Sequence, residues 1–108
     1  MDTTYKSYIP AVAGSFTGTG QSAPFAPMAK RGFNIWLGAF TGVVQLEASP
    51  PGDGINWYIV TANGTQLEKW TNPTAALTDQ WQTDEPGVQF RLNCTSYVSG
   101  SPSYRLSQ

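Results

Sequence analysis

Turn residues divide residues 33–108 into short runs, and this division constrains the fold more than any other feature. The runs FNIWLGAF, VVQLEAS, NWYIVT, TQLEKWT and VQFRLNCTSYV are separated by Gly-, Pro- and Asn-rich turns such as SPPGDG and DEPG. Apolar and polar residues alternate within the runs, and no stretch of about ten residues carries a helical stripe. The sequence therefore predicts an all-β domain, a small antiparallel sandwich or barrel-like fold of roughly seven strands.

Asn63-Gly64 predicts a tight hairpin inside this domain. The dipeptide is favoured by two-residue turns whose central residues need positive φ. NWYIVT and TQLEKWT flank it, so these two runs are expected to pair. LTDQWQT gives a weaker strand, and SYRLSQ gives a last one at the end of the chain.

Residues 1–32 differ from the rest of the chain in composition and in the absence of a regular apolar pattern. They carry Gly, Ser, Thr, Ala and three prolines, and no strand or helix period persists along them. Because proline presets an extended backbone in itself and in the residue before it, we expect an extended N-terminal arm over residues 1–32, followed by a β-sandwich over residues 33–108. The apolar residues expected to anchor this arm on a partner are Tyr5, Tyr8, Ile9, Phe16 and Phe25.

Composition narrows the classes of partner. Charged residues make up 12% of the chain, against about 25% in ordinary soluble domains, and the formal net charge is −1. The basic residues are scattered, so no nucleic-acid partner is expected. No apolar run approaches the roughly 20 residues of a spanning helix, so no membrane partner is expected either. The first residues lack a secretory signal, which predicts synthesis and folding in a cytoplasm.

The chain offers few groups for catalysis, so no enzymatic activity is expected. There is no His, and Cys94 shares an alternating face with apolar residues, which predicts a small buried side chain. Asp84 and Glu85 sit in a solvated turn context. GSFTGTG lacks the strand, helix and Lys of a phosphate loop, and Asp53 stands alone between glycines. We therefore expect no cofactor and no metal ion.

Aromatic residues are the distinctive resource of this sequence. Four Trp, five Tyr and five Phe make up 13% of the chain, more than a small core is expected to hide. In FNIWLGAF, Phe33, Ile35 and Leu37 share the face expected in the core. Trp36 and Phe40 would then point away from the core and need a cover, supplied by the arm or by another subunit.

Two interpretations of the remaining rings stay open. Aromatic enrichment with few charges is typical of protein interfaces, with Trp36, Phe40 and the arm residues as contacts. The alternative is a sugar-binding surface, on which Asn56, Trp57 and Tyr58 would stack on a saccharide and bind its hydroxyls. A purely structural interpretation places Trp57 and Trp70 in the core of the sandwich. A hydrolase ranks last, because it requires two carboxylates about 5 to 10 Å apart in a cleft.

Residues 32–108 resemble a group of small structural proteins of tailed bacteriophages. The resemblance rests on FTGVVQLEAS, on a turn leading to Asp-Gly and a Trp, and on the close GVQFRLNCTSYVSGSPSYRLSQ. It covers about three quarters of the chain, and the SPPGDGINW turn departs from the pattern by its paired prolines.

The resemblance implies a virion component similar to head decoration or cement proteins. Its partners would be the major capsid protein and further copies of itself in a homo-oligomer, with trimers common among such proteins. It would be made in the host bacterial cytoplasm and act in the virion. The alternative within this setting is a carbohydrate-binding module on a phage head or fibre, used for attachment to cells.

Overall fold

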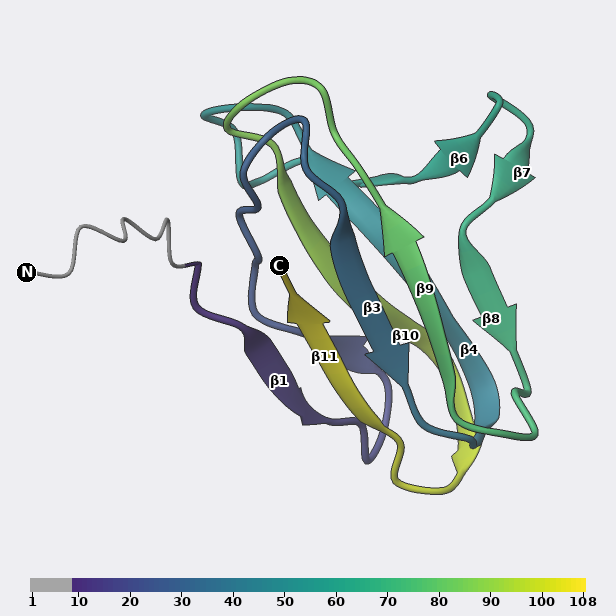
Figure 1. Cartoon of the computed structure of the whole chain (residues 1–108). Coiled ribbons are helices and arrows are strands. Elements are labelled where there is room, and N and C mark those ends of the chain that lie inside the picture. Colours follow the sequence, from purple (N-terminus) through teal and green to yellow (C-terminus); the bar gives the residue numbers. More distant parts are fainter. Residues whose placement is uncertain (1–8) are drawn as a thin grey trace, which may run out of the picture.

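The computed structural model describes residues 9–108, which form an all-β domain without a helix in that range. Two antiparallel sheets face each other, and a small hairpin stands out from them (Figure 1). The predicted all-β fold is confirmed, although the strands are more numerous than the roughly seven expected. The strands are β1 (Val12–Ser15), β2 (Gly20–Gln21), β3 (Phe33–Leu37), β4 (Thr41–Ser49), β5 (Tyr58–Ile59), β6 (Thr61–Ala62), β7 (Gln66–Leu67), β8 (Lys69–Thr71), β9 (Leu77–Trp81), β10 (Gln89–Ser99) and β11 (Ser103–Ser107).

The two sheets are named A and B. Sheet A has the strand order β1-β11-β3-β9. Sheet B has the order β2-β10-β4-β5, and β8 also pairs with β4. Since neighbouring residues of a strand point to opposite faces, each sheet turns one face to the shared core and presents one outer face. The outer faces of sheets A and B are left to be covered by loops of the chain, by a partner or by solvent.

β3 follows the alternation predicted for it. Phe33, Ile35 and Leu37 are buried in the core, while Trp36 lies on the outer face of sheet A. The core rings contact one another, with the centroids of Phe33 and Phe90 4.8 Å apart. The core is thus built from both sheets.

Phe40 does not share the outer face with Trp36, and that prediction is wrong. β3 ends at Leu37, and the chain then bends, with the Gly38 amide donating to the Ser103 carbonyl. This bend resets the alternation, so Phe40 is buried, with its ring centroid 6.4 Å from that of Tyr97.

The hairpin at Asn63-Gly64 is confirmed next to the turn, but the outer parts of the two runs predicted to pair with each other, β5 and β8, pair with β4 instead. Both residues have positive φ, and Thr61 pairs with Leu67 across the turn. β5 and β8 flank this hairpin and lie one after the other along the same edge of β4. β6 and β7 therefore project from a split edge strand (Figure 1).

The segment predicted as an arm is part of the folded domain over residues 9–32. β1 pairs with β11 at the edge of sheet A, and β2 pairs with β10 at the edge of sheet B. Phe25 exchanges two backbone hydrogen bonds with Phe90, of 2.7 and 2.8 Å. Residues 1–8 lie outside the described residues.

Candidate functional site

A loop of residues 50–57 covers one end of the outer face of sheet B. The Ser49 hydroxyl accepts a 2.9 Å hydrogen bond from the Gly54 amide, which ties the loop to the end of β4. At the other end of the loop, the Arg91 guanidinium lies 4.3 Å from the centre of the Trp57 ring. One face of Trp57 is therefore occupied by a cation from the chain's own sheet.

Glu47 organises the polar groups beneath this loop. Its carboxylate accepts hydrogen bonds from Arg91 Nε (2.8 Å), Asn93 Nδ2 (2.9 Å) and Gln45 Nε2 (2.6 Å). Burial alone would raise the pKa of Glu47, but these three donors and the positive charge of Arg91 outweigh it, so the pKa is lowered. Glu47 is a buried, ionised side chain with matched partners, which favours a structural role.

Asp53 fixes the shape of the same loop. Its Oδ1 accepts 2.7 Å hydrogen bonds from the amides of Ile55 and Asn56, and its Oδ2 accepts from Asn56 Nδ2 at 3.1 Å. The hydrogen bonds from Asn56, followed by the one from Ile55, lower the pKa of Asp53. The turn thus holds Ile55 outward, where 84% of its surface is exposed.

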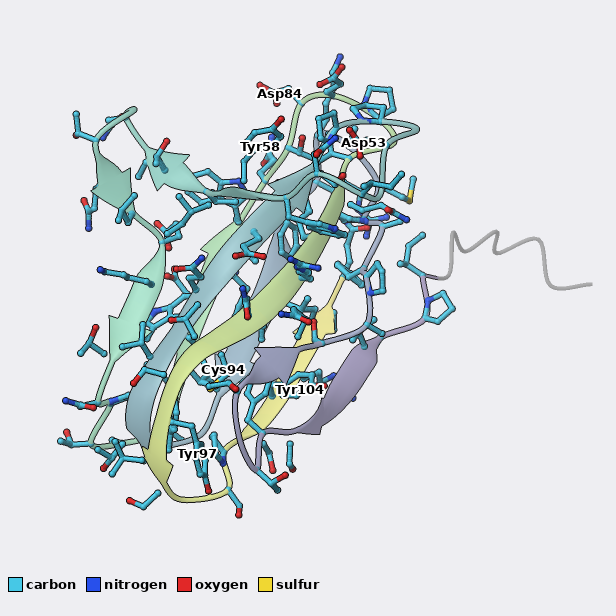
Figure 2. All side chains as sticks on the ribbon, turned by 180° about the vertical axis from the view of Figure 1, so that it is seen from behind. Asp53, Tyr58, Asp84, Cys94, Tyr97 and Tyr104 are labelled. Carbon is cyan, nitrogen blue, oxygen red and sulfur yellow. The ribbon has the colours of Figure 1, made fainter. Side chains whose placement is uncertain are left out.

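Residues 50–58 and 83–88 together form a surface named here the loop end. Tyr58 is 61% exposed and lines a cavity of about 240 Å³ together with Pro50, Ile59, Glu85 and Val88. Figure 2 shows Asp53, Tyr58 and Asp84 at one end of the domain, with Tyr97 at the opposite end. Two large exposed side chains in one loop, Ile55 and Tyr58, mark an interaction surface. Ile55 was missed in the sequence, where an apolar residue inside the Pro- and Gly-rich turn was the available signal.

The outer face of sheet A is open. Trp36 is 46% exposed at the centre of this face, and its Nε1 donates a 3.3 Å hydrogen bond to the Ser107 hydroxyl. Arg105 lies directly opposite Trp36 on β11, and Thr78 lies opposite it on β9. Trp36 is thus accessible, as predicted from its place in β3.

The rings predicted as interface anchors divide into three groups. Phe16, Phe25 and Phe40 are buried in the core, so the prediction that they contact a partner is corrected by their burial within the chain itself. Ile9 also packs against the core. Tyr5 and Tyr8 lie outside the described residues. Trp36 remains exposed.

The three residues predicted for sugar stacking do not share one environment. Trp57 is half-buried, with Arg91 on its ring. It does not belong to the core, where the purely structural interpretation placed it. Asn56 is exposed but uses its side chain on Asp53. Tyr58 is exposed at the loop end. Trp70, also predicted in the core, packs partly buried against it.

Among the described residues, the side chains with acid–base or metal-binding chemistry form no cluster of three or more. Cys94 is buried as predicted, its thiol donates a hydrogen bond to the Ser96 carbonyl, and burial raises the pKa of the thiol. Residues 9–108 contain no group of three or more His, Cys, Asp or Glu side chains placed to hold a metal ion.

Glu68 and Asp79 meet at an open edge between the two sheets. Partial burial raises the pKa of Glu68, and the charge of Asp79 with a hydrogen bond to it raises it further. Glu68 is held from both sides, because its amide donates to the Val60 carbonyl and its own carbonyl accepts from Leu46.

Comparisons with protein-family models, with curated proteins and with solved structures found no match for this chain. Within the described residues, no helix is long and apolar enough to cross a membrane. The fold and the two exposed surfaces therefore carry the functional interpretation.

Proposed function

We propose that the chain is a structural protein of a tailed-phage virion that docks on the assembled head and stabilises it through protein–protein interfaces. The observation that supports this most is the loop end, where Ile55 and Tyr58 are both exposed and Tyr58 lines a cavity. The hydrogen bonds of Asp53 hold this surface in one shape before any partner arrives. Preorganisation of this kind lowers the entropy cost of docking.

The charges of the loop end indicate the chemistry of its partner surface. Residues 50–58 and 83–88 contain Asp53, Asp84 and Glu85 and no Lys or Arg. Two basic residues adjoin them: Arg91, which lies on Trp57 and is paired with Glu47, and Lys30, whose amide donates to the Thr83 carbonyl. A partner with apolar side chains and a basic rim, on the major capsid protein, complements this surface.

Stabilisation of the head follows from mass action. A protein that binds the assembled shell, and not its dissociated subunits, shifts the equilibrium toward the shell. An interface of standard size, about 1,600 Å², is sufficient for specific docking. Further copies of the chain, bound to neighbouring capsid subunits, would add contacts between copies.

Co-sedimentation with purified heads of the phage whose genome encodes the chain tests this function. The double substitution Ile55→Ser and Tyr58→Ser should weaken binding at least tenfold, since exposed apolar anchors dominate interface energetics. Val98→Ser is the matched control, because Val98 is 69% exposed on β10 and lies outside the loop end. Equal binding of the double variant and the control would contradict the proposal, as would a wild-type chain that stays in the supernatant.

A further inference from the structure

On the outer face of sheet A, the indole of Trp36 is surrounded by mostly polar side chains. Trp36 is the only large apolar side chain exposed on this face among the described residues. The side chains around it are small, hydroxylated or amidated, apart from one guanidinium. They are Ala13, Ser15, Asn34, Thr78, Gln80, Ser103, Arg105 and Ser107.

The Trp36 ring is held in place but left uncovered. Its hydrogen bond to Ser107 fixes the ring relative to β11. Arg105 lies opposite it on the sheet, yet the guanidinium that stacks on a ring within residues 9–108 is that of Arg91, on Trp57. The ion pair found in the same range is also that of Arg91, with Glu47, so Arg105 keeps its charge available for a ligand.

Two amides beside Trp36 are preorganised for hydrogen bonding. Gln80 Nε2 donates a 3.0 Å hydrogen bond to Asn34 Oδ1 across β3 and β9. This bond leaves the Gln80 carbonyl oxygen as an acceptor and the Asn34 Nδ2 group as a donor, on residues of the outer face of sheet A. Adjacent donors and acceptors of this kind match the vicinal hydroxyls of a sugar ring.

A cavity adjoins Gln80, one of these two amides. A cavity of about 290 Å³ is lined by Gly32, Gln80, Trp81 and Gln82, so Gln80 belongs both to the open face and to the cavity. The exposed residues Lys30 and Arg31 immediately precede Gly32. An extended ligand lying on Trp36 would therefore reach a second subsite, lined by two Gln side chains and one Trp.

The charges on this side of the domain favour an anion. Arg105 lies on the face, and Lys30 and Arg31 adjoin the cavity. The strands of sheet A contain one acid, Asp79, which lies on the inner side of β9 close to Glu68. Asp84 and Glu85 belong to the turn of the loop end.

We infer that this face binds a carboxylated oligosaccharide. Trp36 stacks on the apolar face of one sugar ring, the Asn34 and Gln80 amides bind its hydroxyls, and Arg105 binds a carboxylate. A protein partner fits less well, because a lone Trp provides no apolar interface centre and each buried hydroxyl and amide would need a matched group. A nucleic acid also fits less well, because Trp36 is, within the described part of the chain, the one large exposed ring on this face and successive bases need a row of rings to stack on.

Titration of the isolated chain by calorimetry and by Trp fluorescence tests the inference. The probes are oligogalacturonate, oligoalginate and hyaluronan fragments, with methyl-esterified oligogalacturonate as the uncharged match and oligothymidylate as the nucleic acid. We expect at least one acidic saccharide to bind, its methyl ester to bind more weakly, and Trp36→Ala to lower the affinity by at least about tenfold.

Arg105→Gln separates charge recognition from stacking. It should weaken binding of the carboxylated probe severalfold and leave the weaker binding of its methyl ester unchanged. Val98→Ser should bind as the wild type does, and an unchanged melting temperature shows that each variant is folded. Absence of binding by every acidic probe at about 10 mM, equal binding by Trp36→Ala, or preference for oligothymidylate would overturn the inference. Because the assay uses no phage heads, its failure leaves the docking proposal standing, and the reverse also holds.

Discussion

Each sheet of the sandwich carries one Trp on its outer side, and the two rings differ in what covers them. Trp57 is half-buried and lies against Arg91, which is in turn paired with the buried Glu47. Trp36 is 46% exposed and lies among hydroxyls and amides. The chain completes the outer face of sheet B with its own loop and leaves that of sheet A open.

The covered Trp57 and the exposed Trp36 are therefore expected to differ in role: Trp57 contributes to the stability of the fold, and Trp36 is available to bind a ligand. Groups that satisfy one another inside the chain contribute to its folding, whereas groups left exposed with fixed geometry are available to a ligand. Substitutions on the two faces should therefore have opposite consequences.

Glu47→Ala should give the largest loss of stability. It removes the acceptor for Arg91, Asn93 and Gln45 in a partly buried network, which should lower the free energy of unfolding by about 2–3 kcal/mol. Urea denaturation measures this change. Glu85→Ala, at an exposed acid of the loop end, is the control and should stay within about 0.5 kcal/mol of the wild type. If both variants lost the same free energy of unfolding, the Glu47 network would contribute no more to stability than an exposed acid does, which would contradict the account.

Trp57→Ala should give an intermediate loss, about 1–2 kcal/mol, because it uncovers Arg91 and removes partly buried ring surface. The same denaturation experiment measures it. Glu47→Ala and Trp57→Ala should be less than additive in the double variant, since both act on Arg91. Strict additivity would show that the loop and the network are independent.

Trp36→Ala should change the free energy of unfolding by less than about 1 kcal/mol, because an exposed ring loses little on truncation. Comparison with Trp57→Ala uses the same chemical change on the other face. A loss as large as that of Trp57→Ala would place Trp36 in the structural part of the molecule.

Glu68→Gln should give the smallest effect, and one that depends on pH. The folded pKa of Glu68 lies above its unfolded value of about 4.3, so the stability it contributes is present below that pH and is lost as the pH rises through the folded pKa. Glu68→Gln should therefore gain in melting temperature relative to the wild type between about pH 4 and 7, by less than about 4 °C. A difference in melting temperature that stays constant across this range would show that neither burial nor Asp79 raises the pKa of Glu68.

The sequence predicted those features that depend on local pattern. The alternation of Phe33, Ile35 and Leu37 with Trp36 predicted which side of β3 enters the core, and it is confirmed. Asn63-Gly64 predicted the hairpin because its turn type is encoded by two residues.

The features that the sequence did not predict depend on contacts between distant residues. β1 and β2 are short strands whose partners, β11 and β10, follow many residues later, so residues 9–32 show no local period. The sequence placed Phe40 on the wrong face because the alternation of FNIWLGAF runs through Gly38 without a visible break. In the structure the chain bends at Gly38, and the alternation does not continue beyond it. Trp57 was interpreted either as a core residue or as a sugar-stacking ring. Neither interpretation anticipated its position over Arg91, because that position depends on the fold of the preceding loop.

The most direct test is oxidative footprinting of the isolated chain, with the labelling rate of each Trp read by mass spectrometry. The open outer face of sheet A predicts that Trp36 is labelled fastest, and that Trp57, Trp70 and Trp81, which are all half-buried, are labelled more slowly. Labelling of Trp36 that is as slow as that of Trp57 would contradict an open face and, with it, the availability of this ring to any ligand.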